Sequence, residues 1–315
     1  MIHHVYANRS NIGDWLSARG IQRLLAPLPV TEHLCDDPFV GATLAALSRA
    51  GADDLVVIGG GGLLMDYFTP FWHGLLALPN RPRYLLWGVG CCDLKAEASL
   101  PDRSLTAAVV AGAVRCELRD DLSRGFVGDL ALPPAVACPA LFELVATQPG
   151  SGLLHVDNYT TVGATAFDRM DAEGRQFSRR SGRRYRRTNN QIEPGSAVQL
   201  ADCLALYRDA DIVLSSALHG CIIAVAMGRQ LVAVSGDRKI DAFMAAAGLA
   251  DWVIDHRDLD ALPERLAALP RQRDALGWAE GQRQRQRGIA AAIAALASAR
   301  SETARRAGAN REQSR

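Results

Sequence analysis

“DIVLSSALHGCIIAVAMGR”, residues 211–229, joins the pattern of a β-strand to the pattern of an α-helix. The opening apolar run predicts a buried strand, and the apolar residues after Gly220 recur at helical spacing. Ser215, Ser216 and His219 stand at the corner between the two patterns. In an open α/β sheet such a corner lies at the carboxyl end of a strand, where ligands bind. His219 could donate to an anion or move a proton there, although a lone histidine is also common as a structural residue.

Short apolar strand patterns alternate with helical patterns along most of the chain. The strand patterns are “DLVVIGGGG”, “RYLLWGVGCC”, a short stretch at Cys116–Arg119, “GLLHV”, “DIVLSS”, “QLVAVSG” and “DWVID”. The helical patterns include “LLMDYFTPFWHGLLAL”, interrupted at Pro70, “AVQLADCLALYRDA”, “GCIIAVAMG” and “KIDAFMAAAGL”. This order predicts the α/β class, with parallel sheets covered by helices. We expect two similar Rossmann-like halves that face a central cleft.

A Pro- and Gly-bearing stretch, “LPPAVACPALFELVATQPGSG” at residues 132–152, predicts the connection between the two halves. We expect an N-terminal α/β domain over residues 1–147 and a C-terminal α/β domain over residues 148–270 that carries “SSALHG”. Residues 271–315 follow as a C-terminal helical segment. Its last part, “SETARRAGANREQSR”, has the composition of a frayed tail.

Composition excludes several classes of protein. The 315 residues carry a net charge of +1, which does not indicate nucleic acid as a partner. No apolar run reaches the roughly 18 residues that span a bilayer, and the N-terminus lacks a signal-peptide layout. The seven cysteines show no zinc-like spacing, so we expect no metal site. A cytoplasmic protein is the simplest conclusion.

Two glycine-bearing segments could contribute to a ligand site. Asn11, Gly13 and Asp14 follow a short strand where a helix would begin, and Asn11 or Asp14 could simply cap that helix. The run Gly59–Gly62, which includes Gly60 and Gly61, follows a strand and precedes a helical pattern. Its N–H groups could approach an anion, or the glycines could only permit a tight corner. The run matches neither a dinucleotide fingerprint nor a P-loop.

Two further charged or titratable residues lie at strand ends. In “LRDDLS”, Arg119 could grip a carboxylate or phosphate through two parallel hydrogen bonds. An ordinary salt bridge with Asp120 or Asp121 is the alternative. His155, in the “GLLHV” pattern near the predicted domain junction, is a weaker candidate for substrate contact.

Taken in order, “NIGD”, “VVIGGGGLL”, “LRDDLS” and “SSALHG...AMGRQLVAVSGDRK” resemble the polysaccharide pyruvyl transferase family over about residues 8–249. The resemblance implies a two-domain, GT-B-type fold. It also implies transfer of the enolpyruvyl unit of phosphoenolpyruvate onto two hydroxyls of a sugar. The product is a cyclic pyruvate ketal on a surface or exported glycan, and phosphoenolpyruvate acts as donor substrate rather than cofactor.

Carried over by position, His219 and Leu218 match the family's R-L-H-G motif, whose histidine and backbone contact phosphoenolpyruvate. His219 then acts as acid/base or phosphate contact, Arg119 as an anion clamp and Asp14 as a group that orients sugar hydroxyls. The remaining substrate-binding candidates are Asn11, Gly13, Gly60, Gly61, His155, Ser216, Gly220 and Lys239, of which Lys239 matches the lysine that follows the next strand.

The chain departs from the family pattern at Ala217, where an arginine usually precedes L-H-G. Arg238, Lys239 or the arginines of residues 179–187 could replace that cation. The donor could also differ, or the activity could be lost. Two rival functions follow, a GT-B-type glycosyltransferase that uses a sugar nucleotide and a catalytically silent glycan- or anion-binding protein.

The acceptor implied by the resemblance is a sugar or a lipid-linked oligosaccharide, which could bring the protein to the inner face of the membrane. “SRRSGRRYRRTNNQ”, Ser178–Gln191, contains six arginines without apolar periodicity. This composition predicts a mobile loop, either plain solvated surface or a guide for an anionic acceptor. The sequence determines neither the sugar and its hydroxyl pair nor the oligomeric state.

Overall fold

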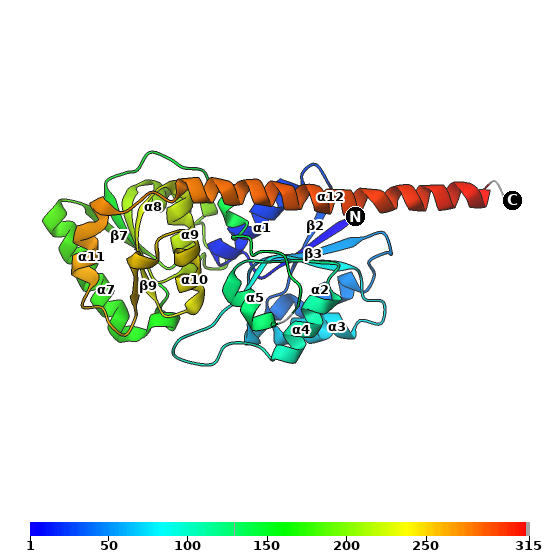
Figure 1. The fold of residues 1–315 in the computed structure, drawn as a ribbon, viewed down its shortest axis with the longest axis horizontal. Helices are drawn as coiled ribbons and strands as arrows, with labels where there is room; N and C mark the ends of the chain where they lie inside the picture. Colours follow the sequence, from blue (N-terminus) through cyan, green and yellow to red (C-terminus); the bar gives the residue numbers. More distant parts are fainter. Residues whose placement is uncertain (129, 313–315) are drawn as a thin grey trace.

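A computed structural model describes residues 1–128 and 130–312, which form two α/β domains side by side (Figure 1). Each domain contains a five-stranded sheet. The strand order is β2-β1-β3-β4-β5 in the N-terminal domain and β10-β9-β8-β6-β7 in the C-terminal domain, and the paired strands run parallel. The predicted α/β class with two parallel sheets is therefore confirmed.

Helices cover both faces of the N-terminal sheet, so its central strands β3 and β4 are apolar and buried along nearly their whole length. The elements are β1 (Ile2–Tyr6), α1 (Ile12–Leu25), β2 (Val30–Leu34), α2 (Val40–Leu47), β3 (Leu55–Leu64), α3 (Thr69–Ala77), β4 (Tyr84–Cys91), α4 (Arg103–Gly112), β5 (Arg115–Leu118), α5 (Asp121–Val127) and α6 (Ala140–Glu143).

The C-terminal domain repeats this layering around β8 and β9. Its elements are β6 (Gly152–Val156), α7 (Tyr159–Ser181), β7 (Arg184–Thr188), α8 (Leu200–Arg208), β8 (Ala210–Ser215), α9 (Leu218–Met227), β9 (Gln230–Ser235), α10 (Arg238–Ala246), β10 (Val253–Asp255), α11 (Leu262–Ala268) and α12 (Leu276–Glu312). Every residue of α9 is buried except His219, which is partly exposed at its first turn. The corner quoted above thus presents one polar side chain from an otherwise buried helix.

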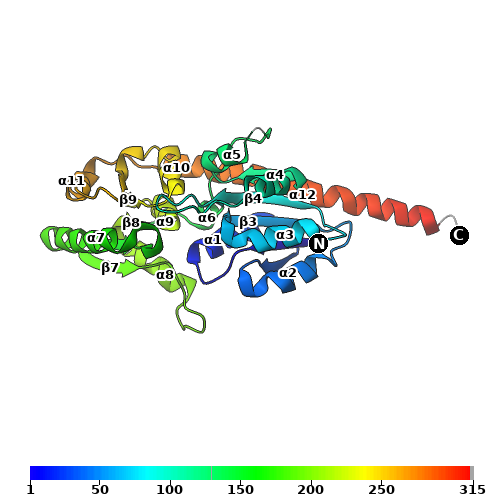
Figure 2. The same ribbon diagram turned by 90° about the horizontal axis from the view of Figure 1, so that it is seen from below.

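Helix α12 runs along both domains and continues past the N-terminal one (Figures 1 and 2). Trp278 packs edge-on against Phe243 of the C-terminal domain. Further along α12, Gln286 accepts a hydrogen bond of 2.6 Å from Trp87 Nε1 in the N-terminal domain. The helix therefore joins the two domains. It includes the segment from Ser301 that composition predicts to fray, and residues 313–315 lie outside the described part of the chain.

The mobile loop predicted for Ser178–Gln191 is wrong, because this segment forms the end of α7 and the edge strand β7. Strand β7 pairs in register with β6. Three arginines of the segment face carboxylates: Arg183, just before β7, contacts Asp211 at 2.9 and 3.0 Å. Arg186 and Arg187, within β7, lie 3.7 and 3.6 Å from Asp209 and Asp157. Edge strands commonly carry charged side chains in place of apolar alternation, so the composition concealed the strand.

The expectation that Gly59–Gly62 follow the strand is also wrong, since all four glycines lie within β3. Gly60 and Gly61 have φ angles of 77° and 95°, and the register with β4 shifts just after them. The strand is therefore bulged, a conformation that favours glycine. Pro70 does not interrupt a helix either, because it occupies the first turn of α3, where proline is tolerated.

None of the described helices combines the length and the apolar character needed to cross a bilayer. All seven cysteines are buried and unpaired. Five of them pack as small core residues, whereas Cys92 and Cys138 lie beside the polar site described next.

Candidate active site

A cleft of about 400 Å³ lies between the two domains. The N-terminal domain contributes Asn11, Asp14 and Arg119, and the C-terminal domain contributes His219 and Lys239. Each of these residues follows a strand, as expected where the carboxyl ends of two parallel sheets meet. The structure thus gathers into one cavity residues that are far apart in the sequence.

The N-terminus of α9 opens into this cleft. Ala217 occupies the N-cap position and offers no side-chain hydrogen bond to the helix. The N–H groups of Leu218, His219 and Gly220 consequently have no partner among the described residues. Ala217, Leu218 and His219 all line the cleft. Unpaired N–H groups and the helix dipole make such an end favourable for a phosphate or carboxylate.

Arg119 presents a buried cation to the same cleft, with only 4% of its side chain exposed. Its Nε donates to Asp120 at 2.9 Å and its Nη2 donates to the Cys91 carbonyl at 2.8 Å. The salt bridge considered as the alternative role is therefore present. It orients the guanidinium, and Nη1 keeps no partner among the described residues, so an anion can still bind there.

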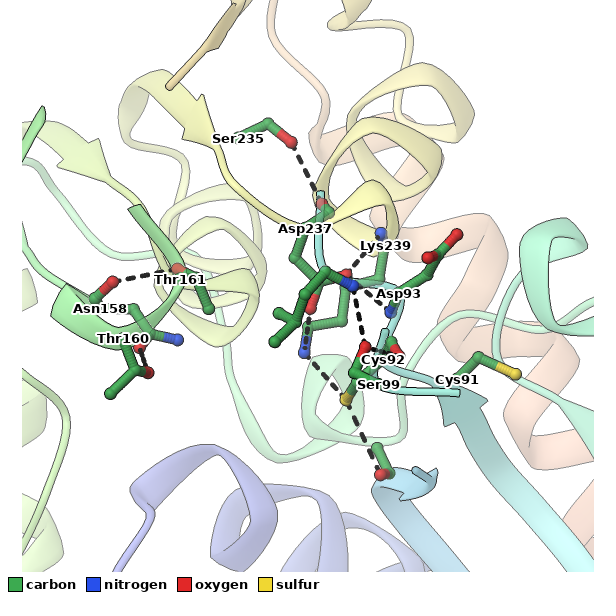
Figure 3. A network of polar contacts seen from close by, with 12 residues as sticks. Cys91, Cys92, Asp93, Ser99, Asn158, Thr160, Thr161, Ser235, Asp237 and Lys239 are labelled. Carbon is green, nitrogen blue, oxygen red and sulfur yellow. Dashed lines mark hydrogen bonds and ion pairs between the residues drawn. The ribbon is translucent and has the colours of Figure 1, made fainter. Parts of the chain in front are cut away.

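Lys239 is a second cation of the site. Its Nζ lies 2.7 Å from the fully buried Asp237 carboxylate and 3.0 Å from Cys92 Sγ in the N-terminal domain (Figure 3). Burial lowers the pKa of Lys239, but Cys92 and Asp237 raise it by more, so the pKa lies above its ordinary value. Lys239 is therefore charged, and its position depends on both domains.

His219 is uncharged in this surrounding. Burial lowers its pKa to about 3, with further lowering by the positive charges of Arg119 and Lys239. The Nε2 atom lies 3.8 Å from Cys138 Sγ, which is also 2.8 Å from Ser17 Oγ. A neutral imidazole can accept a proton, and a bound anion would raise its pKa by attraction.

Asp14 is a carboxyl group of the site whose pKa lies well above its ordinary value. Burial raises its pKa to about 6, although Lys239 and Arg119 partly offset the effect. A carboxyl group with this pKa can both release and accept a proton near neutrality. Asn11 caps α1 by accepting the Gly13 N–H at 2.9 Å, which confirms the capping role considered for it.

Gly13 fixes the position of His219. A β-carbon on Gly13 would lie 1.9 Å from His219 Nδ1, closer than any real contact. We expect Gly13→Ala to displace the imidazole and to lower turnover about 10- to 100-fold, less than loss of the whole side chain, which removes a typical acid–base contribution of ~10²–10⁴. Steady-state rates together with thermal unfolding would measure this.

Gly41→Ala is the matched control, because a β-carbon on this helical glycine meets no atom within 4 Å. That variant should keep full activity and unfold no more easily, since alanine favours helix. Equal activity of the Gly13→Ala and Gly41→Ala proteins would contradict the assigned role of Gly13.

Other predicted residues lie behind the cleft rather than in it. A β-carbon on Gly61 would meet Asp14 Oδ1 at 2.4 Å, and one on Gly60 would meet Ser17 at 2.3 Å, so these glycines let α1 pack closely on β3. Gly220 similarly admits Ser215 Oγ. Ser216 Oγ accepts the Asn158 N–H at 2.7 Å.

His155 is not brought to the cleft. It is fully buried within β6, its Nδ1 lies 2.8 Å from Tyr185 Oη, and burial lowers its pKa to about 4. Of the cations considered as replacements at Ala217, only Lys239 lines the cleft. Arg238 instead pairs with Asp93 at 3.0 Å.

One side of the cleft consists of residues that were not predicted as site residues, and we name it the amide-rich wall. It consists of Asp157, Asn158, Thr160, Asn189, Asn190 and Gln191. These residues directly follow β6 and β7. The rule that identified His219, polar residues at the carboxyl end of a strand, could have identified the first three. The last three were hidden within the segment interpreted as a loop.

In residues 1–128 and 130–312, no three or more His, Cys, Asp or Glu side chains are grouped so that they could hold a metal ion.

Solved structures show the same architecture at low sequence identity. S. aureus MnaA in complex with UDP has a TM-score of 0.58 and 8% identity, over 87% of this chain and 90% of that chain. Methanocaldococcus jannaschii UDP-GlcNAc 2-epimerase in complex with UDP-GlcNAc and UDP has a TM-score of 0.51 and 11% identity, over 91% and 98%. An uncharacterized protein of Klebsiella pneumoniae, KP1_0663, has a TM-score of 0.51 and 13% identity, over 80% and 92%. These similarities confirm the predicted GT-B-type fold.

The amino-acid sequence identifies the protein family to which the chain belongs. No curated protein matches the chain. The family described as “Polysaccharide pyruvyl transferase” matches residues 3–238, which include the α9 corner, Arg119, Asp14 and most of both sheets. The chain therefore belongs to the polysaccharide pyruvyl transferase family.

Proposed function

We propose that the protein transfers the enolpyruvyl unit of phosphoenolpyruvate onto two hydroxyls of a sugar in a surface or exported glycan. The observation that carries this proposal is the cation group of the cleft, Arg119, Lys239 and the uncapped N-terminus of α9, gathered around His219 and Asp14. A donor with a phosphate and a carboxylate needs several such groups.

The reaction balances without an additional reactant. One proton adds to C3 of the donor, whose methylene becomes a methyl group. The first sugar oxygen bonds to C2 and its proton leaves. The second sugar oxygen then replaces the phosphate at C2, and the C2–O bond breaks with its electron pair on phosphate. One hydroxyl proton thus replaces the proton taken up at C3, and the other leaves with inorganic phosphate.

The side chains of the cleft suit these steps. Arg119, Lys239 and the α9 N–H groups bind the donor and stabilise the departing phosphate. We assign Asp14 the delivery of the proton to C3, because its raised pKa keeps it partly protonated. His219, neutral before binding, accepts a hydroxyl proton or hydrogen-bonds the phosphate once the donor raises its pKa.

The missing arginine at Ala217 does not leave the site without positive charge. The N-terminus of α9 has no side-chain cap and borders the cleft, and Lys239 supplies a cation in the same cavity. We therefore favour a catalytically active protein over a silent binding protein. A lipid-linked acceptor would place it at the inner face of the membrane.

Thermal unfolding with added ligands tests this function. We expect phosphoenolpyruvate to raise the Tm, because a ligand that binds only the folded state stabilises it. UDP-GlcNAc should give no comparable rise, and incubation with phosphoenolpyruvate and a glycan acceptor should release inorganic phosphate.

Stabilisation by the nucleotide sugar alone, coupled to glycosyl transfer, would instead support the glycosyltransferase. Stabilisation by phosphoenolpyruvate without phosphate release from any acceptor of a broad glycan panel would support the silent protein.

A further inference from the structure

The amide-rich wall differs chemically from the cation group that it faces. Five of its six members carry uncharged carboxamide or hydroxyl groups, which can both donate and accept hydrogen bonds. Asn158 and Thr160 lie on the segment that leads into α7, across from the cluster of Lys239 and Cys92 (Figure 3). Such groups match the hydroxyls of a neutral ligand better than a phosphate.

Asn190 carries an unsatisfied polar atom in this wall. The residue is 3% exposed, its Oδ1 accepts from Tyr207 Oη at 2.9 Å, and its Nδ2 has no partner. Turning the carboxamide over only exchanges the atom that lacks a partner. A buried polar group without a hydrogen bond is costly, and Asn190 lines the cleft, so a small turn of its carboxamide would let a ligand supply the missing partner.

The backbone of Asn190 is also unusual, with a φ of 59° in the left-handed region. Strained residues of this kind occur preferentially at ligand sites. Two backbone hydrogen bonds to the N-terminal domain hold this conformation. The Asn190 carbonyl accepts the Ile12 N–H at 3.0 Å, and the Ile192 N–H donates to the Ser10 carbonyl at 2.7 Å. The wall is thereby tied to the segment that carries Asp14.

Asn158 and Thr160 of the wall are connected to the α9 corner by hydrogen bonds. The Asn158 N–H donates to Ser216 Oγ at 2.7 Å, and Thr160 Oγ1 donates to Asn158 Oδ1 at 2.8 Å. These bonds use the backbone N–H and the Oδ1 of Asn158, and its Nδ2 has no partner among the described residues. The wall therefore offers donors at positions fixed relative to His219.

The acidic residues in and near the wall disfavour a sugar that carries a carboxylate. Its one ionisable member, Asp157, lies 3.6 Å from Arg187, and Asp14 lines the same cleft. A carboxylate on the sugar would face these two acids, while the cations opposite bind the donor. We propose that the amide-rich wall binds the acceptor as an uncharged pyranose through its ring hydroxyls. This inference rests on the proposed function for its identification of the bound sugar as the acceptor.

Saturation-transfer NMR with methyl glycosides tests the inference. The probes are methyl β-D-galactopyranoside, methyl β-D-glucopyranoside and methyl β-D-glucuronide, each with the full-length protein. We expect signals from at least one neutral glycoside and weaker signals from the glucuronide. Asn158→Ala and Asn190→Gly should each raise the apparent Kd of the neutral glycoside about 5- to 10-fold, as loss of one or more hydrogen bonds predicts.

Gln284→Ala, on the exposed face of α12, is the matched control and should leave the glycoside signal unchanged. Asn190→Gly introduces a residue that tolerates positive φ. If Asn190→Gly fails to fold, Asn158→Ala still tests the wall. Unchanged glycoside binding in the folded variants, preference for the glucuronide, or no glycoside signal from the wild type would overturn the inference.

The rise in Tm with phosphoenolpyruvate separates this result from the proposed function. A rise without a glycoside signal contradicts the wall alone. A glycoside signal lost in Asn158→Ala, without any effect of phosphoenolpyruvate on the wild type, contradicts the donor and leaves a sugar site at the wall.

Discussion

Replacing His219 with alanine should lower kcat/KM by ~10²–10⁴-fold, the usual contribution of one acid–base group. The fold should persist, because His219 is the one partly exposed residue of the otherwise buried α9, and its ring lies at the cleft rather than in the core. Phosphate release from phosphoenolpyruvate, measured against acceptor concentration, would report the rate, and circular dichroism would report the fold.

His73→Ala is the matched control, since His73 is exposed on α3 away from the cleft and should tolerate the change without loss of rate. If His219→Ala unfolds the protein, or if it keeps the wild-type rate, the histidine is structural and the acid–base assignment is wrong.

Asp14→Asn should abolish most turnover, again by ~10²–10⁴-fold, while phosphoenolpyruvate binds as tightly as before or more tightly. The amide keeps the shape of the side chain but cannot deliver a proton, and it removes a negative charge that repels the donor. This opposite movement of rate and affinity would distinguish Asp14 from a residue that only supports the fold.

The pH dependence of binding gives the same residue a second signature. Burial raises the pKa of Asp14 to about 6, and an adjacent anion raises it further, so the complex takes up a proton. Affinity for phosphoenolpyruvate should therefore fall as pH rises above about 6. Asp14→Asn should weaken this dependence, whereas the exposed Asp260→Asn should preserve it. Equal pH profiles for the wild type and Asp14→Asn would show that Asp14 does not titrate on binding.

The sequence predicted the fold best where strands are buried on both faces. “DIVLSS” and “QLVAVSG” correspond to β8 and β9, whose short apolar runs are typical of strands in a parallel sheet. Prediction failed at the edge of the sheet, because β7 carries arginines that face acids outside the strand in place of an apolar alternation. The 23 residues of α7 were not assigned from the sequence, although the helix is amphipathic, because they carry many charges and Gly163 kinks the helix.

The candidate site was predictable in part for a related reason. A polar residue that directly follows a buried strand, such as His219 or Arg119, signals its position locally. The contact of Lys239 with Cys92 joins residues 147 positions apart, and the link of Asn190 to Ile12 crosses between domains. Contacts of this kind depend on how two completed sheets are placed, which local patterns do not encode.

Helix α12 has a consequence for synthesis of the chain. Ile289 and Ile293 complete the apolar cluster around Trp87, although these residues are translated about two hundred positions later. The N-terminal domain thus leaves the ribosome with part of its interior uncovered, and it remains so while the C-terminal domain is made. Docking of α12 is then the closing step of maturation. A chain that is cut short before Gln286 exposes an apolar surface that chaperones and proteases recognise.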